Sequence, residues 1–169
     1  MIVLKKVNLE DVDKEFLFIT ELPVNENGFT NSYHGISKEE FYTETIYQII
    51  NHSEGKDLPD GYVPETYFFL WDEDNIVGLF RIRHFLNDFL RNGAGHIGYG
   101  IHPDYRGKGY ATKGLALAIE EAKRIIPEDE IHMSVNINNI ASFRVQEKNG
   151  AYLHHSDELE HYTRIKIRQ

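Results

Sequence analysis

A turn rich in glycine and basic residues, from Arg106 to Thr112, carries the residue types best suited to binding chemistry in this chain. It reads Arg-Gly-Lys-Gly-Tyr-Ala-Thr and follows a short apolar run at 97–101. From Ala111 onward, apolar residues recur at helical spacing. The first N–H groups of a helix have no partner within it, and the helix dipole adds partial positive charge there. The turn therefore predicts a site for an anionic group such as phosphate.

The composition narrows the chemistry that this turn could serve. The chain has 169 residues, 41% of them hydrophobic, and we expect a single domain over 1–169. It contains no cysteine, which excludes disulfides, thiolate metal sites and a cysteine nucleophile. A net charge of −9 argues against a nucleic-acid partner and suits a cationic acceptor. No segment has the roughly 20 apolar residues of a membrane helix, so we expect a cytoplasmic protein with no membrane partner.

The elements that must position the turn follow from periodicity and from turn-forming residues. The alternation over 2–7 predicts a strand, and a helix is expected over 9–20. Ser37 and Glu40 form a capping-box pattern that begins a second helix. The later elements expected are strands at 67–71, 76–83 and 97–101, a helix at 110–126, a strand at 131–137, a helix from 139 to about 149, and strands at 152–154 and 162–167. This is an α/β fold with a mixed sheet, in the order β-α-α-β-β-β-α-β-α-β-β.

The spacing Arg106-x-x-Gly109-x-Ala111 resembles the acyl-coenzyme A signature of the GNAT N-acetyltransferases, and the order of elements also resembles theirs over nearly the whole chain. The resemblance is nearest to the ribosomal-protein and small-molecule branch. It implies acetyl-coenzyme A (acetyl-CoA) as acyl donor, with its pyrophosphate on the turn and its pantetheine arm beside strand 97–101. We expect the coenzyme to be bound by Arg106, Gly107, Lys108, Gly109, Tyr110, Ala111 and Thr112 of the turn and by unpaired backbone N–H groups of Tyr99 and Ile101. His102 is a further candidate that could instead only shape the turn.

A second segment, from Asn139 to Gly150, resembles the later part of the GNAT pattern. Asn139 opens a helix, where it also suits the N-cap, and Ser142 is the small residue three places on. The resemblance implies that Asn139 and Ser142 lie beside the pantetheine arm. Many relatives carry a tyrosine that protonates the departing thiolate where this chain has Gln146, and an amide cannot act as that acid. Coenzyme A could then leave as the thiolate, or Tyr152 or another donor could protonate it.

His96, at the start of strand 97–101, is the candidate general base. The implied reaction is direct attack of a primary amine on the thioester, and the amine must be neutral to attack. Histidine titrates near pH 7 and suits that task. The alternative for His96 is a structural role at the end of the strand. The alternative for the protein is a non-catalytic acyl-CoA-binding regulatory module, an interpretation that Gln146 favours.

The acceptor is expected to be a small-molecule or peptide amine, and the sequence leaves open a homodimer and a longer acyl donor. Its pocket is expected after the first strand, where aromatic residues that could line it are Phe29, Tyr33, His34, Phe41 and Tyr62. No metal is expected, because adjacent His154 and His155 would point to opposite faces of a hairpin. The run 93–98 matches G-x-G-x-x-G, but it precedes a strand rather than opening a helix, which argues against dinucleotide binding.

Overall fold

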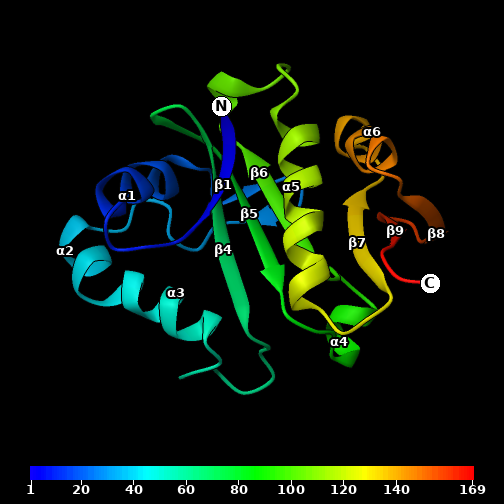
Figure 1. Cartoon of the computed structure of the whole chain (residues 1–169), viewed down its shortest axis with the longest axis horizontal. Coiled ribbons are helices and arrows are strands. Elements are labelled where there is room, and N and C mark those ends of the chain that lie inside the picture. Colours follow the sequence, from blue (N-terminus) through cyan, green and yellow to red (C-terminus); the bar gives the residue numbers. More distant parts are fainter.

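The computed structural model describes residues 1–169 and contains two larger antiparallel sheets (Figure 1). The four-stranded sheet has the order β1-β4-β5-β6, and the three-stranded sheet has the order β7-β9-β8. The first comprises β1 (Ile2–Lys6), β4 (Glu65–Asp72), β5 (Asn75–Arg83) and β6 (Ile97–Ile101). The second comprises β7 (Glu130–Asn136), β8 (Tyr152–Ser156) and β9 (Glu160–Lys166).

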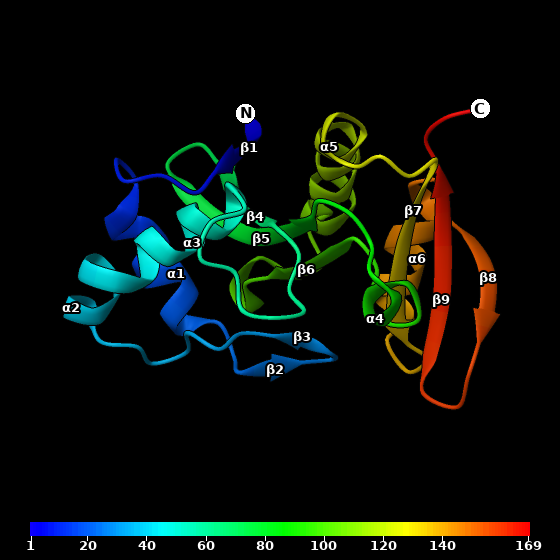
Figure 2. The same cartoon turned by 90° about the horizontal axis from the view of Figure 1, so that it is seen from below.

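Helices cover both faces of the four-stranded sheet, which explains the continuous apolar run in β4. Helix α5 (Tyr110–Ile125) lies on one face, and α1 (Val12–Glu21) and α3 (Ile46–Ser53) lie on the other (Figure 2). Phe68 and Leu70 belong to the same core cluster as residues of α5, whereas Phe69 and Trp71 cluster with residues of α1 and α3. A π-helical segment, Phe41–Thr45, joins α3 to the short α2 (Lys38–Glu40), and α4 (Asp88–Arg91) and α6 (Ile140–Lys148) follow later. None of these helices combines the length and apolar character needed to span a bilayer.

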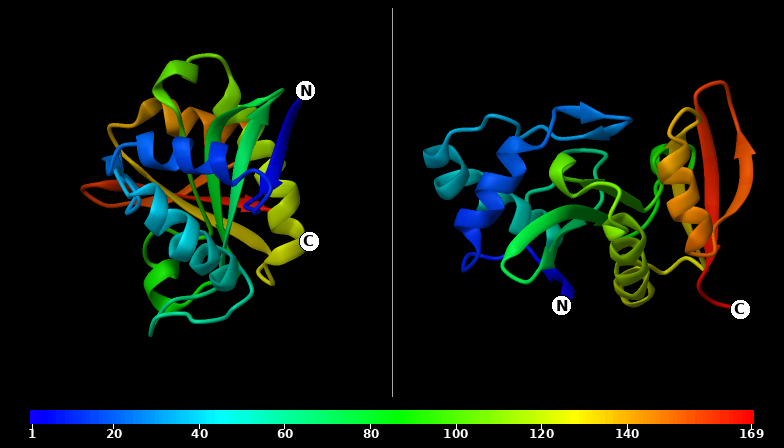
Figure 3. Two further views of the ribbon diagram at one scale, coloured as in Figure 1. Left: turned by 90° about the vertical axis from the view of Figure 1, so that its left-hand side faces the viewer. Right: turned by 90° about the horizontal axis from the view of Figure 1, so that it is seen from above.

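The order of elements expected from the sequence is confirmed, with the short α4 and a small hairpin as additions. The hairpin, formed by β2 (Asn25–Glu26) and β3 (Phe29–Thr30), lies between the first two helices, where the sequence predicted no element. Its turn is Asn27-Gly28, with φ of 53° and 91°, the left-handed conformations that a two-residue hairpin turn requires. The hairpin projects from α1 toward the three-stranded sheet (Figures 2 and 3).

The two sheets meet only at the start of β6. Gly95 and Met133 form an isolated bridge, and the His96 N–H donates to the His132 carbonyl at 2.7 Å. A Cβ atom on Gly95, which has φ of +70°, would lie 2.1 Å from the carbonyl oxygen of His132. Only glycine permits so close an approach. Beyond this junction β6 has a free edge, and the candidate site lies there.

Candidate functional site

The turn between β6 and α5 presents backbone N–H groups, as its sequence predicts. Gly107 and Gly109 have φ of 73° and 83°, so they provide left-handed conformations that other residues rarely adopt. Gly109 is the N-cap of α5 and has no side chain to cap the helix. The N–H groups at the start of α5 therefore remain available to an anionic ligand.

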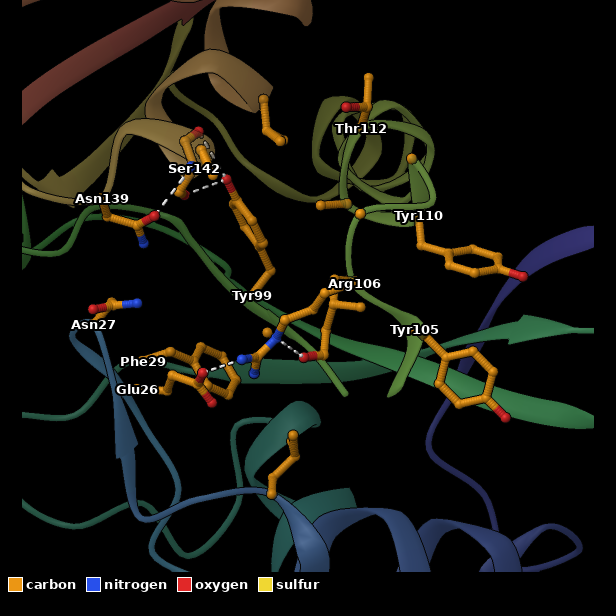
Figure 4. Close-up of a pocket in the computed structure, with 18 of the residues that line it drawn as sticks. Glu26, Asn27, Phe29, Tyr99, Tyr105, Arg106, Tyr110, Thr112, Asn139 and Ser142 are labelled. Carbon is orange, nitrogen blue, oxygen red and sulfur yellow. Dashed lines mark hydrogen bonds and ion pairs between the residues drawn. The ribbon is translucent and has the colours of Figure 1, made fainter. Parts of the chain in front are cut away.

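These N–H groups border a cavity of about 470 Å³, called here cavity A (Figure 4). Its wall is formed by the end of β6, the turn, the start of α5, the start of α6 and the β2–β3 hairpin. Two segments far apart in sequence, each predicted to contact the coenzyme, thus share one cavity. The predicted residues that line it are Tyr99, Ile101, Arg106, Gly107, Gly109, Tyr110, Ala111, Thr112, Asn139 and Ser142.

Two residues predicted to bind the coenzyme, His102 and Lys108, are outside the wall of cavity A. His102 Nδ1 accepts from the Asp104 N–H at 3.2 Å and caps the short 3₁₀ turn Pro103–Tyr105. Lys108 Nζ donates to the Asp104 carbonyl at 3.1 Å and lies 5.5 Å from the centroid of the Tyr105 ring. The structure therefore gives both side chains a role in shaping the turn.

The free edge of β6 faces cavity A. Gly98 and Gly100 pair with Arg81 and Leu79 of β5, so the N–H groups of the intervening Tyr99 and Ile101 point to the opposite edge. This is the arrangement expected of a strand that offers donors to an extended ligand. The Ile101 carbonyl, on the same edge, accepts from Arg106 Nε at 3.0 Å.

Tyr99 links β6 to the start of α6. Its hydroxyl lies 2.6 Å from Ser142 Oγ, and the N-cap side chain of Asn139 accepts from the Ser142 N–H at 3.2 Å (Figure 4). Burial raises the pKa of the Tyr99 phenol, although the Ser142 and Gln146 side chains oppose that shift. Tyr99 therefore keeps its proton near neutral pH.

The β2–β3 hairpin forms the wall of cavity A that the sequence did not predict. Glu26 forms an ion pair with Arg106, which draws the arginine toward the hairpin. The Phe29 ring packs over β6, where a Cβ atom on Gly100 would lie 3.1 Å from it. The signal that could have revealed this wall is Asn27-Gly28, because Asn-Gly is a strong hairpin signal.

His96 occupies an environment that argues against its predicted role as general base. Its side chain is fully buried and lines none of the cavities that border the site. The His132 N–H donates to Nδ1 at 2.9 Å, so the proton is on Nε2, which lies 3.0 Å from a Glu128 carboxylate oxygen. Neither ring nitrogen has a lone pair free to accept a proton from a substrate. Burial lowers the His96 pKa, with Glu128 opposing, and the residue joins the two sheets.

A smaller cavity of about 180 Å³, cavity B, adjoins cavity A and shares Tyr99, Asn139 and Ser142 with it. It is also lined by Gln146 and by Glu160 of β9. Burial, and next the nearby Asp157, raise the pKa of the Glu160 carboxyl, although His161 opposes the shift. A carboxylate whose pKa is raised is better suited to accept a proton near neutral pH.

Gln146 is an α6 residue that lines cavity B, and no tyrosine of α6 does so. Gln146 is buried, and its Oε1 accepts from Thr163 Oγ1 at 2.6 Å. Tyr152, the alternative donor named from the sequence, is exposed on β8 and donates to Glu130 at 2.6 Å, outside every cavity described here. Among the phenols, Tyr99 lines both cavity A and cavity B.

A third cavity of about 620 Å³, cavity C, shares Thr30, Arg81 and Arg83 with cavity B. Of the aromatic residues expected around an acceptor, Tyr33 and Tyr62 line cavity C, and Phe29 lines cavities A and B. His34 instead bonds through Nδ1 to the Leu22 carbonyl at 2.8 Å, and Phe41 is buried in the core. The three cavities form a series from the turn to the region between α3 and β4.

The arrangement resembles several solved structures at low sequence identity. The ribosomal L7/L12 α-N-protein acetyltransferase RimL, in complex with coenzyme A, has a TM-score of 0.70 and 14% identity over 99% of this chain and 94% of that one. The microcin C7 self-immunity acetyltransferase MccE, in complex with acetyl-CoA and AMP, has a TM-score of 0.69 and 15% identity over 98% and 92%. A spermidine N-acetyltransferase from Vibrio cholerae, in complex with coenzyme A and spermine, has a TM-score of 0.65 and 16% identity over 98% and 94%.

No curated protein matches the sequence. At 14% to 16% identity, the solved structures show the fold alone. The family is shown by a match of the sequence to a family model. Residues 2–152 match the model of the acetyltransferase (GNAT) domain, which spans both the turn at Arg106 and the segment that begins at Asn139. The chain belongs to the GNAT acetyltransferase family.

Proposed function

We propose that this protein is an acetyl-CoA-dependent N-acetyltransferase that acetylates a primary amine by direct attack on the thioester. The observation that carries the proposal is the shared cavity A, in which the uncapped start of α5 and the free edge of β6 meet Asn139 and Ser142 of the other segment. The GNAT family and the coenzyme-bound neighbours of the same fold support acetyl-CoA as donor.

The donor is held mainly by backbone groups in this proposal. The pyrophosphate binds the N–H groups at the start of α5, where the dipole and the unpaired donors favour negative charge. The pantetheine arm then runs along β6, and its amides pair with the free N–H and carbonyl groups of Tyr99. This places the thioester toward cavity B, near the start of α6.

Glu160 is the proposed base for the acceptor. An aliphatic amine is mostly protonated at neutral pH and must lose a proton to attack the carbonyl carbon. Glu160 lines cavity B, and burial raises the pKa of its carboxyl. It accepts the proton from the ammonium group, directly or through water, as the C–N bond forms.

Tyr99 is the proposed acid. When the C–S bond breaks, the electron pair remains on sulfur, and a nearby O–H can donate a proton to the thiolate. Tyr99 lines both cavities A and B, and its protonated hydroxyl is oriented by Ser142 Oγ at 2.6 Å. Tyr99 would thus act from β6 in place of the α6 tyrosine of many relatives, whose position Gln146 occupies in this chain.

The test is release of free thiol from acetyl-CoA in the presence of a panel of amines. We expect turnover with at least one amine, and losses of roughly 10²-fold to 10⁴-fold in kcat for Glu160→Gln and for Tyr99→Phe, the usual range for a general base or acid. Coenzyme A binding, measured by calorimetry, should change little in either variant. Glu158→Gln and Tyr152→Phe, both at exposed side chains, are matched controls. Coenzyme A binding without turnover of any amine would instead support the non-catalytic binding module.

A further inference from the structure

Arg81, at the boundary of cavities B and C, interacts with the Tyr67 phenol but forms no ion pair with a carboxylate. Its guanidinium carbon lies 4.6 Å from the centroid of the Phe29 ring and 5.8 Å from that of the Tyr67 ring. Its Nη2 lies 3.8 Å from the position that a Cβ atom on Gly98 would occupy. Its Nε is buried and has no hydrogen-bond partner. By contrast, the neighbouring Arg83 lies 3.4 Å from the carboxylate of Glu65.

An unpaired guanidinium in a cavity favours an anionic ligand. Taking a charge out of water is costly unless an opposite charge or hydrogen-bond acceptors compensate for it. Arg81 has no carboxylate within 4 Å, and its planar set of N–H donors matches a carboxylate or phosphate. A ligand that supplies such a group to the terminal nitrogens would compensate for the guanidinium charge.

The aromatic wall of cavity C reinforces this preference. Burial raises the pKa of the Tyr33 and Tyr67 phenols, so both stay protonated and offer no negative charge to Arg81. The Arg81 charge opposes that rise at both phenols, which shows that they lie within its field. Glu65 is paired with Arg83 and acts on Arg81 only from beyond ion-pair distance, so Arg81 is the arginine of this wall without a carboxylate partner.

Cavity B also contains one unpaired acid. Glu26 forms an ion pair with Arg106, whereas Glu160 forms none. Glu160 and Arg81 thus line the same small cavity as opposite charges that are not paired with each other. A polyamine such as the spermine bound by the Vibrio cholerae neighbour would bring a further cation toward Arg81, which is unfavourable.

We propose that the acceptor is a zwitterionic amine, whose amino group faces Glu160 and whose carboxylate or phosphate binds Arg81. This inference rests on the proposed N-acetyltransferase function and specifies its substrate class. Acceptors of this class are small amino acids, their phosphonate analogues, and amino alcohols whose hydroxyl group is esterified to phosphate.

The experiment compares matched acceptor pairs that differ only in the anionic group. An amino acid is compared with its amide, and an aminoalkyl phosphate with the corresponding amino alcohol, in the thiol-release assay. We expect kcat/KM to be higher for the anionic member by roughly 10-fold to 100-fold, the range for a hydrogen-bonded charged group. The anionic group whose pair shows the larger ratio of kcat/KM values, carboxylate or phosphate, is the one that the site prefers.

Arg81→Gln should remove this preference, whereas Arg124→Gln, at an exposed arginine of α5 outside the cavities, should retain it. The loss should appear mainly in KM for the anionic acceptor, with KM for acetyl-CoA nearly unchanged. Calorimetric binding of the amino acid to the protein saturated with coenzyme A gives a second readout that needs no turnover. Arg81→Lys, which keeps the charge, should retain part of the affinity if Arg81→Gln does not fold.

The outcomes separate this inference from the function on which it rests. Equal or faster acetylation of the neutral or cationic member of each pair, with no effect of Arg81→Gln, would overturn the zwitterionic acceptor and leave the enzyme intact. Absence of turnover with every amine would overturn the proposed function. Binding of the amino acid that is equal in wild type and Arg81→Gln would also overturn the role of Arg81.

Discussion

The two ends of β6 differ in how completely their polar groups are satisfied. At the start of the strand, the N–H of His96 donates to β7, its carbonyl accepts from the Arg83 N–H at 2.8 Å, and both ring nitrogens have partners. At its end, the N–H groups of Tyr99 and Ile101 point to an edge that no strand covers. The first end, called here the closed end, joins the two sheets, and the second, the open end, faces the cavities.

This difference teaches that residue type alone does not identify a catalytic group. Histidine at the start of β6 has suitable chemistry, but its hydrogen bonds are already made within the protein. Near the open end, the uncapped start of α5 and the buried Nε of Arg81 lack partners in the protein. Unsatisfied polar groups beside a cavity are therefore the better guide to where a ligand binds.

The largest expected effect is at the closed end, for Gly95→Ala. The added Cβ would lie 2.1 Å from the His132 carbonyl oxygen, at a φ of +70°, so the junction of the sheets must open. We expect the free energy of unfolding to fall by about 4 kcal/mol or more, the size seen when backbone strain and steric overlap combine. Urea denaturation measures it.

Gly150→Ala is the matched control for the close approach. Gly150 has a φ of +89°, but nothing lies within 4 Å of its Cβ position, so only the conformational strain of about 1 kcal/mol is expected. Similar losses for both variants would show that the contact between Gly95 and His132 does not close the junction, and the contrast between the two ends of β6 would fail.

The next effect is at the open end, for Ala111→Glu. Ala111 lines cavity A in the first turn of α5, and a carboxylate there would repel the pyrophosphate. We expect coenzyme A affinity to fall roughly 100-fold, which is about 2.7 kcal/mol, with the unfolding free energy nearly unchanged, because an acid suits a helix N-terminus. Calorimetry and urea denaturation give the two values.

Ala116→Glu makes the same change on an exposed position of α5, outside cavity A, and should leave coenzyme A affinity within twofold of wild type. If Ala111→Glu bound coenzyme A as tightly as this control, the start of α5 would not be the pyrophosphate site. The pair thus tests the open end as Gly95 and Gly150 test the closed end.

The parts of the site that the sequence predicted are those determined by local patterns. The turn from Arg106 to Thr112 follows from glycines, charges and the helical periodicity that comes after it, all within one short segment. Asn139 was identified in the same way, because an N-cap is a local feature. Both segments reach cavity A because the order of strands and helices follows the family's arrangement.

The parts that the sequence did not predict depend on contacts between distant segments. Whether His96 is free or buried depends on Glu128 and on His132, more than 30 residues away in the chain. Arg81 and Glu160 come from β5 and β9, and no local pattern places them beside the same cavity. The predicted single domain and the predicted cytoplasmic location stay predictions.

The smallest expected effect concerns His96→Gln and its dependence on pH. Burial lowers the His96 pKa, so between its folded value and the ordinary 6.5 the unfolded chain binds more protons than the folded one. The contribution of His96 to the wild-type unfolding free energy should therefore have its full value above about pH 7 and should decline as the pH falls through 6.5. His132, whose pKa burial lowers to about 4, adds a decline of the same sign.

The glutamine can still accept a hydrogen bond but cannot gain a proton. We expect His96→Gln to lose about 2 kcal/mol of unfolding free energy at pH 7.5, from imperfect pairing of buried polar groups, and to decline less steeply toward pH 5 than wild type. Its kcat should keep the wild-type pH profile if Glu160 rather than His96 accepts the proton, as we propose. A variant that folds at both pH values but loses the acidic limb of that profile would return His96 to catalysis, and would show that hydrogen bonds completed in the free protein do not exclude a catalytic role.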